Sequence, residues 1–182
     1  YINELISNCT SRNINLVIPT IDTELLILAE NRDKLLSHGI NSVISSENFI
    51  HKCRDKRLIH SFFSQNNIET PQEFSKDDYK LPVFIKPVDG SRSLNTFLIN
   101  SEDEFVENHF KNEQLMFLEY IDQSEYVEFT CDLYFGKDHE LKCVVPRKRI
   151  EVRDGEVNKG KTEKNILVDF IKKKLPYIEG AQ

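Results

Sequence analysis

Apolar positions in the first fifty residues follow the order strand, helix, strand. Residues 14–18 form an apolar run that Pro19 ends, and residues 40–44 form a second run. Between these runs, Asp22 can cap a helix, and Gly39 suits the left-handed position just after it. The expected apolar face of this helix comprises Ile21, Leu25, Leu28, Leu35 and Leu36. The short connections predict that the two strands pair in parallel.

Two strands are fewer than a doubly wound α/β lobe needs. The chain also opens inside an expected helix, with Leu5 and Ile6 on its apolar side. We therefore expect residues 1–50 to be the C-terminal part of a Rossmann-like lobe, with an N-terminal piece missing.

The pattern changes after residue 50 to an α+β arrangement. A helix with an apolar side should end at the asparagine pair 66–67, and a capping box at residues 101–104 should open another. The first helix carries Leu58, Ile59, Phe62 and Phe63, and the second should have Phe105, Val106 and Phe110 inward. The expected strands are residues 83–86, 94–99, 115–118, 128–135 and 141–150. The last two form an antiparallel hairpin around a turn at residues 136–139.

Composition limits the class of protein. The 182 residues carry a net charge of −6, which argues against nucleic acid as the main partner. No run approaches the roughly 18 apolar residues of a membrane helix, so no membrane association is expected. The four cysteines are spaced too widely for a zinc knuckle or a CxxC pair, and free thiols in a reducing, cytoplasmic compartment are expected. They are Cys9, Cys53, Cys131 and Cys143.

Two lysines are the main candidates for binding a polyphosphate. Lys86 ends an expected strand and stands directly before Pro87 and a short turn. A single lysine is usually a solvated surface group, but an ammonium that ends an apolar strand is costly to bury without an anionic partner. Lys56, on a separate helix, could supply a second cation while the turn closes over the phosphates. The candidate groups are Lys56, Lys86, Gly90, Ser91 and Ser93.

The two lysines are followed by an apolar segment at residues 117–121 and by an acidic strand that starts at Glu128. This order resembles the ATP-grasp family, in particular the carbamoyl-phosphate synthase large-subunit-like ligases. The resemblance implies an incomplete ATP-grasp fold over residues 51–182, preceded by the end of a Rossmann-like pre-ATP-grasp lobe over residues 1–50. It also implies ATP as the bound nucleotide and Mg²⁺ as the accompanying metal.

The resemblance assigns nucleoside contacts as well. Glu119, Tyr120 and Ile121 would meet the adenine edge, and Glu128 would accept hydrogen bonds from the ribose hydroxyls. Glu125 competes for the ribose role, but Glu128 is preferred because a strand pattern follows it directly. Alternatively, these glutamates are ordinary members of an acidic stretch.

Residues 147–164 reverse the acidic balance, with seven basic against four acidic side chains. Arg147 and Arg149 are two positions apart on an expected strand and should project to one side. Guanidinium groups suit a phosphoryl group or a carboxylate substrate, so these two are the candidate catalytic residues. The other basic residues have weaker interpretations: a solvated strand edge for Lys148 and Arg153, and a mobile loop near the phosphates for Lys159 and Lys161.

The catalytic metal site of the family is expected outside this chain. ATP-grasp enzymes hold magnesium with an acid on one strand and a Glu-x-Asn on the next, and no Glu-x-Asn lies on a strand that the pattern predicts. The parent protein is then expected to phosphorylate a carboxylate or bicarbonate and to pass the acyl phosphate to an amine or ammonia. These residues alone should be inactive. ATP and a small carboxylate are the expected partners, and homodimerisation stays open.

Two other classes of protein remain open. A kinase of another fold would also have a lysine-bearing strand and a hinge, but the sequence contains no His-Arg-Asp or Asp-Phe-Gly set. A non-catalytic, degenerate ATP-grasp domain with a regulatory or interaction role would keep the shape without metal ligands. A Glu-x-Asn strand pair further along the parent protein would favour the ligase.

Overall fold

The computed structural model describes residues 1–90, 93–122, 124–153 and 155–182. The chain divides into two compact units, each assembled from more than one stretch of sequence. The first unit combines Tyr1–Cys53, Tyr134–Cys143 and Leu175–Gln182, and the second combines Arg54–Leu133 and Val144–Lys174. The predicted domain boundary at residue 50 stays a prediction, because compactness alone does not test it.

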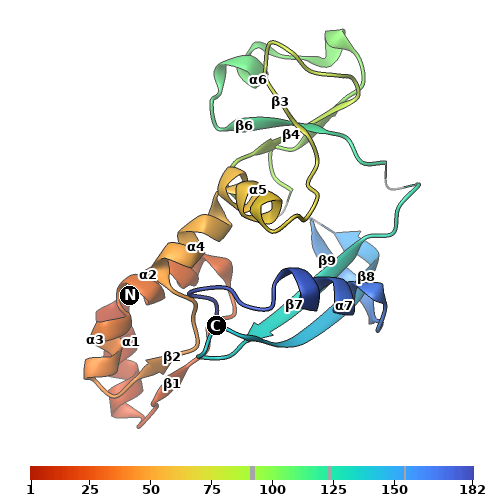
Figure 1. Ribbon diagram of the computed structural model, residues 1–182. Helices are drawn as coiled ribbons and strands as arrows, with labels where there is room; N and C mark the ends of the chain where they lie inside the picture. The colour runs from red at the N-terminus through yellow and green to blue at the C-terminus, as the bar shows by residue number, and fades with distance from the viewer. Residues whose placement is uncertain (91–92, 123, 154) are drawn as a thin grey trace. The chain divides into compact units, whose positions relative to one another are not determined.

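The first unit contains a two-stranded parallel sheet, in which Leu16 of β1 (Leu16–Val17) pairs with Asn41 of β2 (Asn41–Ser42) (Figure 1). The predicted parallel pair is confirmed, although both strands are shorter than the apolar runs. The helical elements around it are α1 (Ile2–Ser11), the 3₁₀ turn η1 (Asp22–Glu24), α2 (Leu25–Glu30), α3 (Arg32–Ser37) and α4 (Glu47–Arg54). Their buried core includes Ile2, Ile6, Cys9, Leu28, Leu35 and Ile40.

The single helix predicted between β1 and β2 is broken. Asn31 separates α2 from α3, and its side-chain amide donates to the carbonyl four residues earlier at 2.9 Å, in competition with regular backbone pairing. Leu28 and Leu35 are fully buried, as predicted. Ile21 and Leu36 are 54% and 46% exposed, because one continuous apolar face requires one continuous helix.

The second unit contains a four-stranded antiparallel sheet in the order β3-β6-β4-β5. The strands are β3 (Glu73–Phe74), β4 (Val83–Pro87), β5 (Phe97–Ile99) and β6 (Leu115–Glu119). In β4, Val83 and Ile85 are fully buried in the core, whereas Phe84 and Lys86 alternate to the other face. The strands predicted at residues 83–86 and 115–118 are therefore confirmed.

Helix α5 (Lys56–Gln65) precedes this sheet in the chain. It begins after Asp55, whose side-chain Oδ1 accepts a hydrogen bond from the Arg57 N–H at 2.8 Å. It ends at Asn66, and Asn67 adopts a left-handed φ of 54°, which confirms the predicted end. Asp55 thus fixes the position at which Lys56 starts the helix.

The helix predicted from residue 101 begins later than expected. A 3₁₀ turn, η2 (Glu102–Glu104), precedes α6 (Glu107–Lys111). Ser101 Oγ donates to Glu104 Oε1 at 3.0 Å, so the acid closes a turn instead of opening a helix. Phe105 packs against the core and stacks on Phe117 with ring centroids 5.9 Å apart. Val106 is 55% exposed, so its predicted inward position is wrong.

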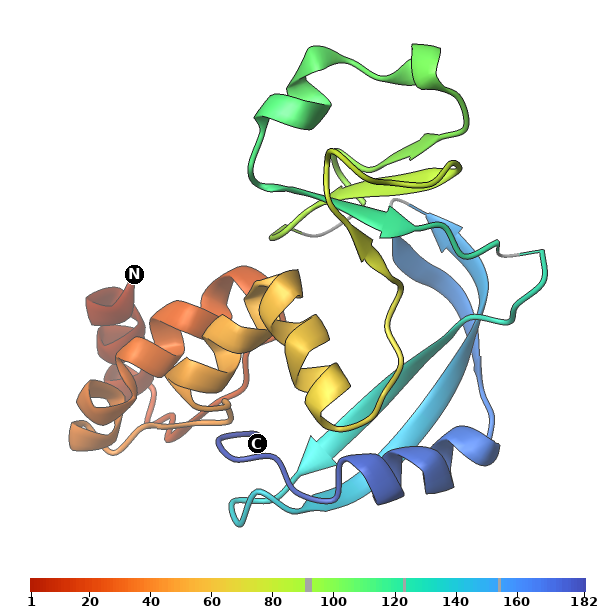
Figure 2. The same cartoon turned by 45° about the horizontal axis from the view of Figure 1, so that its top comes forward.

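A three-stranded sheet has the order β7-β8-β9. Its strands are β7 (Phe129–Phe135), β8 (Leu141–Arg153) and β9 (Glu156–Thr162), followed by helix α7 (Ile166–Lys174). Figure 2 shows the long strands β7 and β8 side by side. The loop predicted for Lys159 and Lys161 is wrong, because both residues lie on β9 and pair with β8. In the part of the chain that the structure describes, no helix has the length and apolarity that crossing a membrane requires.

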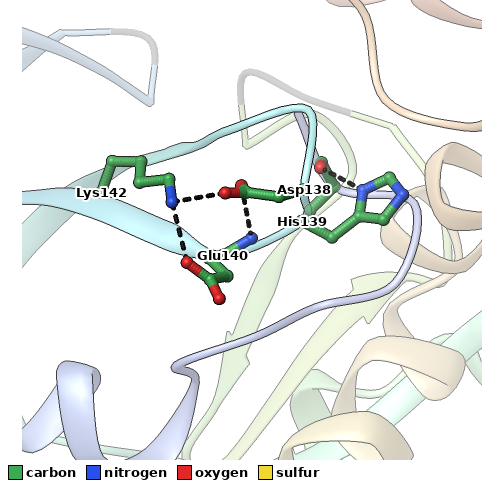
Figure 3. Close-up of polar contacts among 5 residues, drawn as sticks. Asp138, His139, Glu140 and Lys142 are labelled. Carbon is green, nitrogen blue, oxygen red and sulfur yellow. Dashed lines mark hydrogen bonds and ion pairs between the residues drawn. The ribbon is translucent and has the colours of Figure 1, made fainter.

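The turn between β7 and β8 is held by side chains of the first unit (Figure 3). Lys142 Nζ donates to Asp138 Oδ2 at 2.6 Å and to Glu140 Oε2 at 2.8 Å. The His139 ring lies with Nδ1 3.0 Å from the Ala181 carbonyl oxygen. The predicted turn is confirmed, and it is tied to a segment distant in sequence.

Candidate functional site

Two lysines from separate elements share one cavity in the second unit. The cavity has a volume of about 250 Å³, and we call it the lysine cavity. Its lining residues are Lys56, Phe84, Lys86, Pro87, Asp89, Gly90, Ser93, Leu94, Thr96 and Gly155. It therefore brings together four of the five candidate phosphate-binding residues. The fifth, Ser91, lies outside the described residues.

Local structure explains why the two lysines meet. Lys56 stands at the first position of α5, and its N–H donates to the Val88 carbonyl at 2.8 Å, beyond the end of β4. Its ammonium donates to the Gly90 carbonyl at 3.1 Å. Lys86 reaches the same space because β4 buries every second residue. Gly90 has a φ of +92°, which a residue with a side chain rarely adopts.

Among the described residues that line the cavity, two lysines stand against a single carboxylate, that of Asp89. Burial lowers the pKa of Lys86, and the nearby charge of Lys56 lowers it further, while Glu73 raises it. Since the ammonium is partly desolvated beside a like charge, a bound anion would restore the missing stabilisation. The pKa of His60 is lowered by burial and then by Lys86. His60 was missed at the sequence level, although its spacing of four residues from Lys56 on one helix was the available signal.

The predicted adenine-binding residues lie at the end of β6. The Glu119 N–H donates to the Gln72 carbonyl at 2.8 Å, and Glu119 Oε2 accepts from the Gln72 N–H at 3.1 Å. Tyr120 is half-buried, and Ile121 is 41% exposed. None of these three lines the lysine cavity as far as the described residues show. Their contact with adenine stays a prediction.

Glu128, directly before β7, is paired with Arg149 of β8. Arg149 Nη1 donates to Glu128 Oε1 at 2.6 Å, and the Arg149 N–H donates to the Glu128 carbonyl at 3.0 Å. A second guanidinium nitrogen of Arg149, Nη2, donates to the Gly155 carbonyl at 2.9 Å. The predicted ribose acceptor is therefore connected to a residue that lines the lysine cavity.

Arg147 has a different set of contacts. Its Nη2 lies 3.3 Å from Asp132 Oδ1, and its side chain is 38% exposed against 18% for Arg149. In the β8–β9 ladder, Arg147 pairs with Thr162 and Arg149 pairs with Gly160, two positions apart. The Nε atoms of both arginines are buried without a partner in the described structure. Neither arginine lines the lysine cavity, so the catalytic role assigned to them is not tested by its geometry.

The lysine cavity does not fit a magnesium site by itself. Among the described lining residues, Asp89 alone carries a carboxylate, and two lysines, Lys56 and Lys86, line the same cavity. The expectation that no Glu-x-Asn lies on a strand was wrong, because residues 156–158 have this sequence and lie on β9. Three ligand-type side chains approach one another in the first unit, but all are exposed: Glu30, Glu47 and His51.

Comparison with protein-family profiles matches residues 1–44 to the PylC-like N-terminal domain. A search of curated protein sequences finds no significant match. Among solved structures, the chain is similar to the biotin carboxylase domain of Hydrogenobacter thermophilus 2-oxoglutarate carboxylase, with a TM-score of 0.66 and 13% identity over 85% of this chain. It is also similar to the L-amino acid ligase of Bacillus licheniformis, with a TM-score of 0.57 and 17% identity over 90% of this chain.

A third similar structure is an ATP-grasp superfamily protein from Archaeoglobus fulgidus, with a TM-score of 0.56 and 16% identity over 91% of this chain. These likenesses show the fold. The chain has an incomplete ATP-grasp fold, preceded by the end of a Rossmann-like pre-ATP-grasp lobe, as the resemblance predicted. It spans 38%, 40% and 51% of the lengths of the three matched chains. The carbamoyl-phosphate synthase-like subtype stays a prediction.

Proposed function

We propose that this chain is the nucleotide-binding part of an ATP-grasp ligase. Lys56 and Lys86 would bind the triphosphate of ATP in the lysine cavity, with Gly90 and Ser93 in the turn beside it. The observation that carries this proposal is the convergence of two ammonium groups on a cavity with a single lining carboxylate among the described residues. An ATP-grasp fold around such a cavity supports ATP as the anion.

The reaction of the parent protein would be activation of a carboxylate. A carboxylate oxygen, or an oxygen of bicarbonate, attacks the γ-phosphorus, which forms an acyl phosphate and releases ADP. An amine or ammonia then attacks the acyl carbon and displaces inorganic phosphate. The two lysines would hold the phosphates and offset the charge that they carry. Magnesium, when bound, would neutralise further phosphate charge, and its ligands are proposed to lie outside these residues.

The names of similar proteins agree with this class of chemistry but do not select the substrate. The biotin carboxylase domain is described as a dimer with MgADP, ADP and bicarbonate, and the second protein is named an L-amino acid ligase. For this chain we propose a small carboxylate or bicarbonate as the acceptor. A carbamoyl-phosphate synthase-like subtype, a homodimer and a cytoplasmic location belong to the same proposal.

The test is a calorimetric titration of ATP into the full chain and into Lys86→Ala. Removing a charge-assisted contact should weaken ATP binding by ~10-fold or more, corresponding to roughly 1.5–3 kcal/mol. Lys80→Ala is the matched control, because Lys80 is an exposed lysine of the same unit that does not line the cavity. Equal affinities for the wild type and Lys86→Ala would remove the proposed role of the lysine cavity.

A further inference from the structure

Arg149 connects two parts of the proposed nucleotide site. One side of its guanidinium donates to the carboxylate of Glu128 at 2.6 Å, and the other donates to the carbonyl of Gly155 at 2.9 Å. Its side chain is only 18% exposed. A planar guanidinium holds its donors in fixed directions, so the positions of its two acceptors are fixed relative to each other.

The Gly155 contact reaches the phosphate end of the site. Gly155 lies in the turn between β8 and β9, has a φ of +76° and lines the lysine cavity together with Lys56 and Lys86. The Glu128 contact reaches the residue that is predicted to accept hydrogen bonds from the ribose. The Arg149 side chain is therefore a direct link between the predicted ribose acceptor and the lysine cavity, in addition to the backbone pairing of the strands.

We propose that Arg149 is a positioning residue that couples Glu128 to the Gly155 side of the lysine cavity. This inference rests on the proposed function and changes the role predicted for Arg149, because two of its donors are already engaged within the chain. Arg149 acts through Glu128 and Gly155 and not by contact with a phosphoryl group. The fixed spacing favours a ligand that contacts Glu128 and the lysine cavity at once, because the site then loses less conformational entropy on binding.

The consequence is selectivity between ligands that share a triphosphate. ATP engages the ribose acceptor and the lysine cavity, whereas inorganic triphosphate engages the cavity alone. Replacing Arg149 removes its contacts with Glu128 and Gly155, so the affinity for ATP should fall more than the affinity for triphosphate. The ratio of the two affinities is the readout, because protein that fails to fold lowers the active fraction equally for both ligands.

Arg153 provides a matched control. It lies four residues away on the same strand, its Nε donates to Glu151 Oε1 at 2.8 Å, and none of its hydrogen bonds in the described structure involves Glu128 or Gly155. Arg149→Gln should lower the ratio of ATP to triphosphate affinity by on the order of 10-fold, and Arg153→Gln should leave it unchanged. Arg149→Lys should fail to restore the ratio, because a single ammonium does not reproduce the two-sided fork.

The coupling itself is tested by combining variants in the full chain at one fixed salt concentration. If Arg149 acts through Glu128, Arg149→Gln should change the ratio much less in a Glu128→Gln background than in the wild type. Equal losses of ATP and triphosphate binding in Arg149→Gln would overturn the coupling and favour direct contact with phosphate. Absence of ATP binding by the wild type would overturn the proposed function itself, and the coupling with it.

Discussion

The free-energy cost of keeping Lys86 charged depends on whether an anionic ligand occupies the lysine cavity. In the free protein its pKa is lowered by burial and by Lys56. A bound polyphosphate favours the ammonium and raises this pKa again, so binding takes up protons where free Lys86 is partly neutral. ATP affinity should therefore fall as pH rises through the lowered pKa of free Lys86, and this group should add no pH dependence well below it.

Calorimetry over an alkaline pH series, in two buffers with different heats of ionisation, measures this proton uptake directly. Lys86→Arg is the control, because arginine stays charged throughout the series. The wild type should take up protons on binding ATP, and Lys86→Arg should take up fewer. Identical proton uptake by the two proteins would show that Lys86 is not the titrating group.

At the scale of elements, the start of α5 depends on Asp55. Asp55→Ala removes the acceptor of the Arg57 N–H and should lower the free energy of unfolding by about 0.5–2 kcal/mol, whereas Asp55→Asn keeps a capping side chain and should cost much less.

The stabilisation by Asp55 should also depend on pH. The hydrogen bond from the Arg57 side chain is the largest cause that lowers the pKa of Asp55. The contribution of the Asp55 carboxylate to stability is thus fully present above the pKa that Asp55 has in the unfolded chain. It is lost as pH falls through the lowered pKa of Asp55 in the folded state.

Urea unfolding of the three proteins across acidic pH measures both effects. Asp55→Ala and Asp55→Asn should lack the acid-dependent loss that the wild type shows. Equal destabilisation by alanine and asparagine would mean that the carboxylate acts through its charge on Arg57 and not as a helix cap.

The helices and strands that were predicted correctly are those in which apolar residues recur with a clear period. β4 and α5 were found because their apolar residues recur at the intervals of a strand and a helix. The errors fall where a side chain inside an expected helix bonds to a nearby group. Asn31 bonds to a carbonyl four residues earlier and breaks a helix, and Glu104 closes a turn with Ser101 where a longer helix was expected.

The candidate site, like the fold, was predicted only in part. The two lysines were found because each stands at the boundary of a strongly patterned element, and the structure brings them to one cavity. The partners of Arg149 were not predicted, because Glu128 and Gly155 meet it only through the register of three strands. Sequence pattern indicates which face a residue occupies on its strand, but it does not give the residue opposite.

At the scale of the whole molecule, the lysine cavity is lined by residues of the second unit in the described structure. ATP should therefore slow hydrogen exchange most at the start of α5 and the end of β4, and should leave β1 and β2 nearly unchanged. Exchange measured by mass spectrometry with and without ATP tests this, with Lys86→Ala as the variant that should show little protection. Protection of equal size in β1 and β2 would place the ligand elsewhere.

The first unit is completed by residues that are synthesised late. Its opening stretch, Tyr1–Cys53, is joined by Tyr134–Cys143 and Leu175–Gln182. The Ser46 N–H donates to the Gly180 carbonyl at 2.6 Å, and the Ile178 N–H donates to the His139 carbonyl at 3.0 Å. Residues 1–53 must therefore wait for residues 175–182 to be synthesised before the first unit is complete, whereas every residue of the second unit precedes residue 175. The order of folding can thus run opposite to the order of translation.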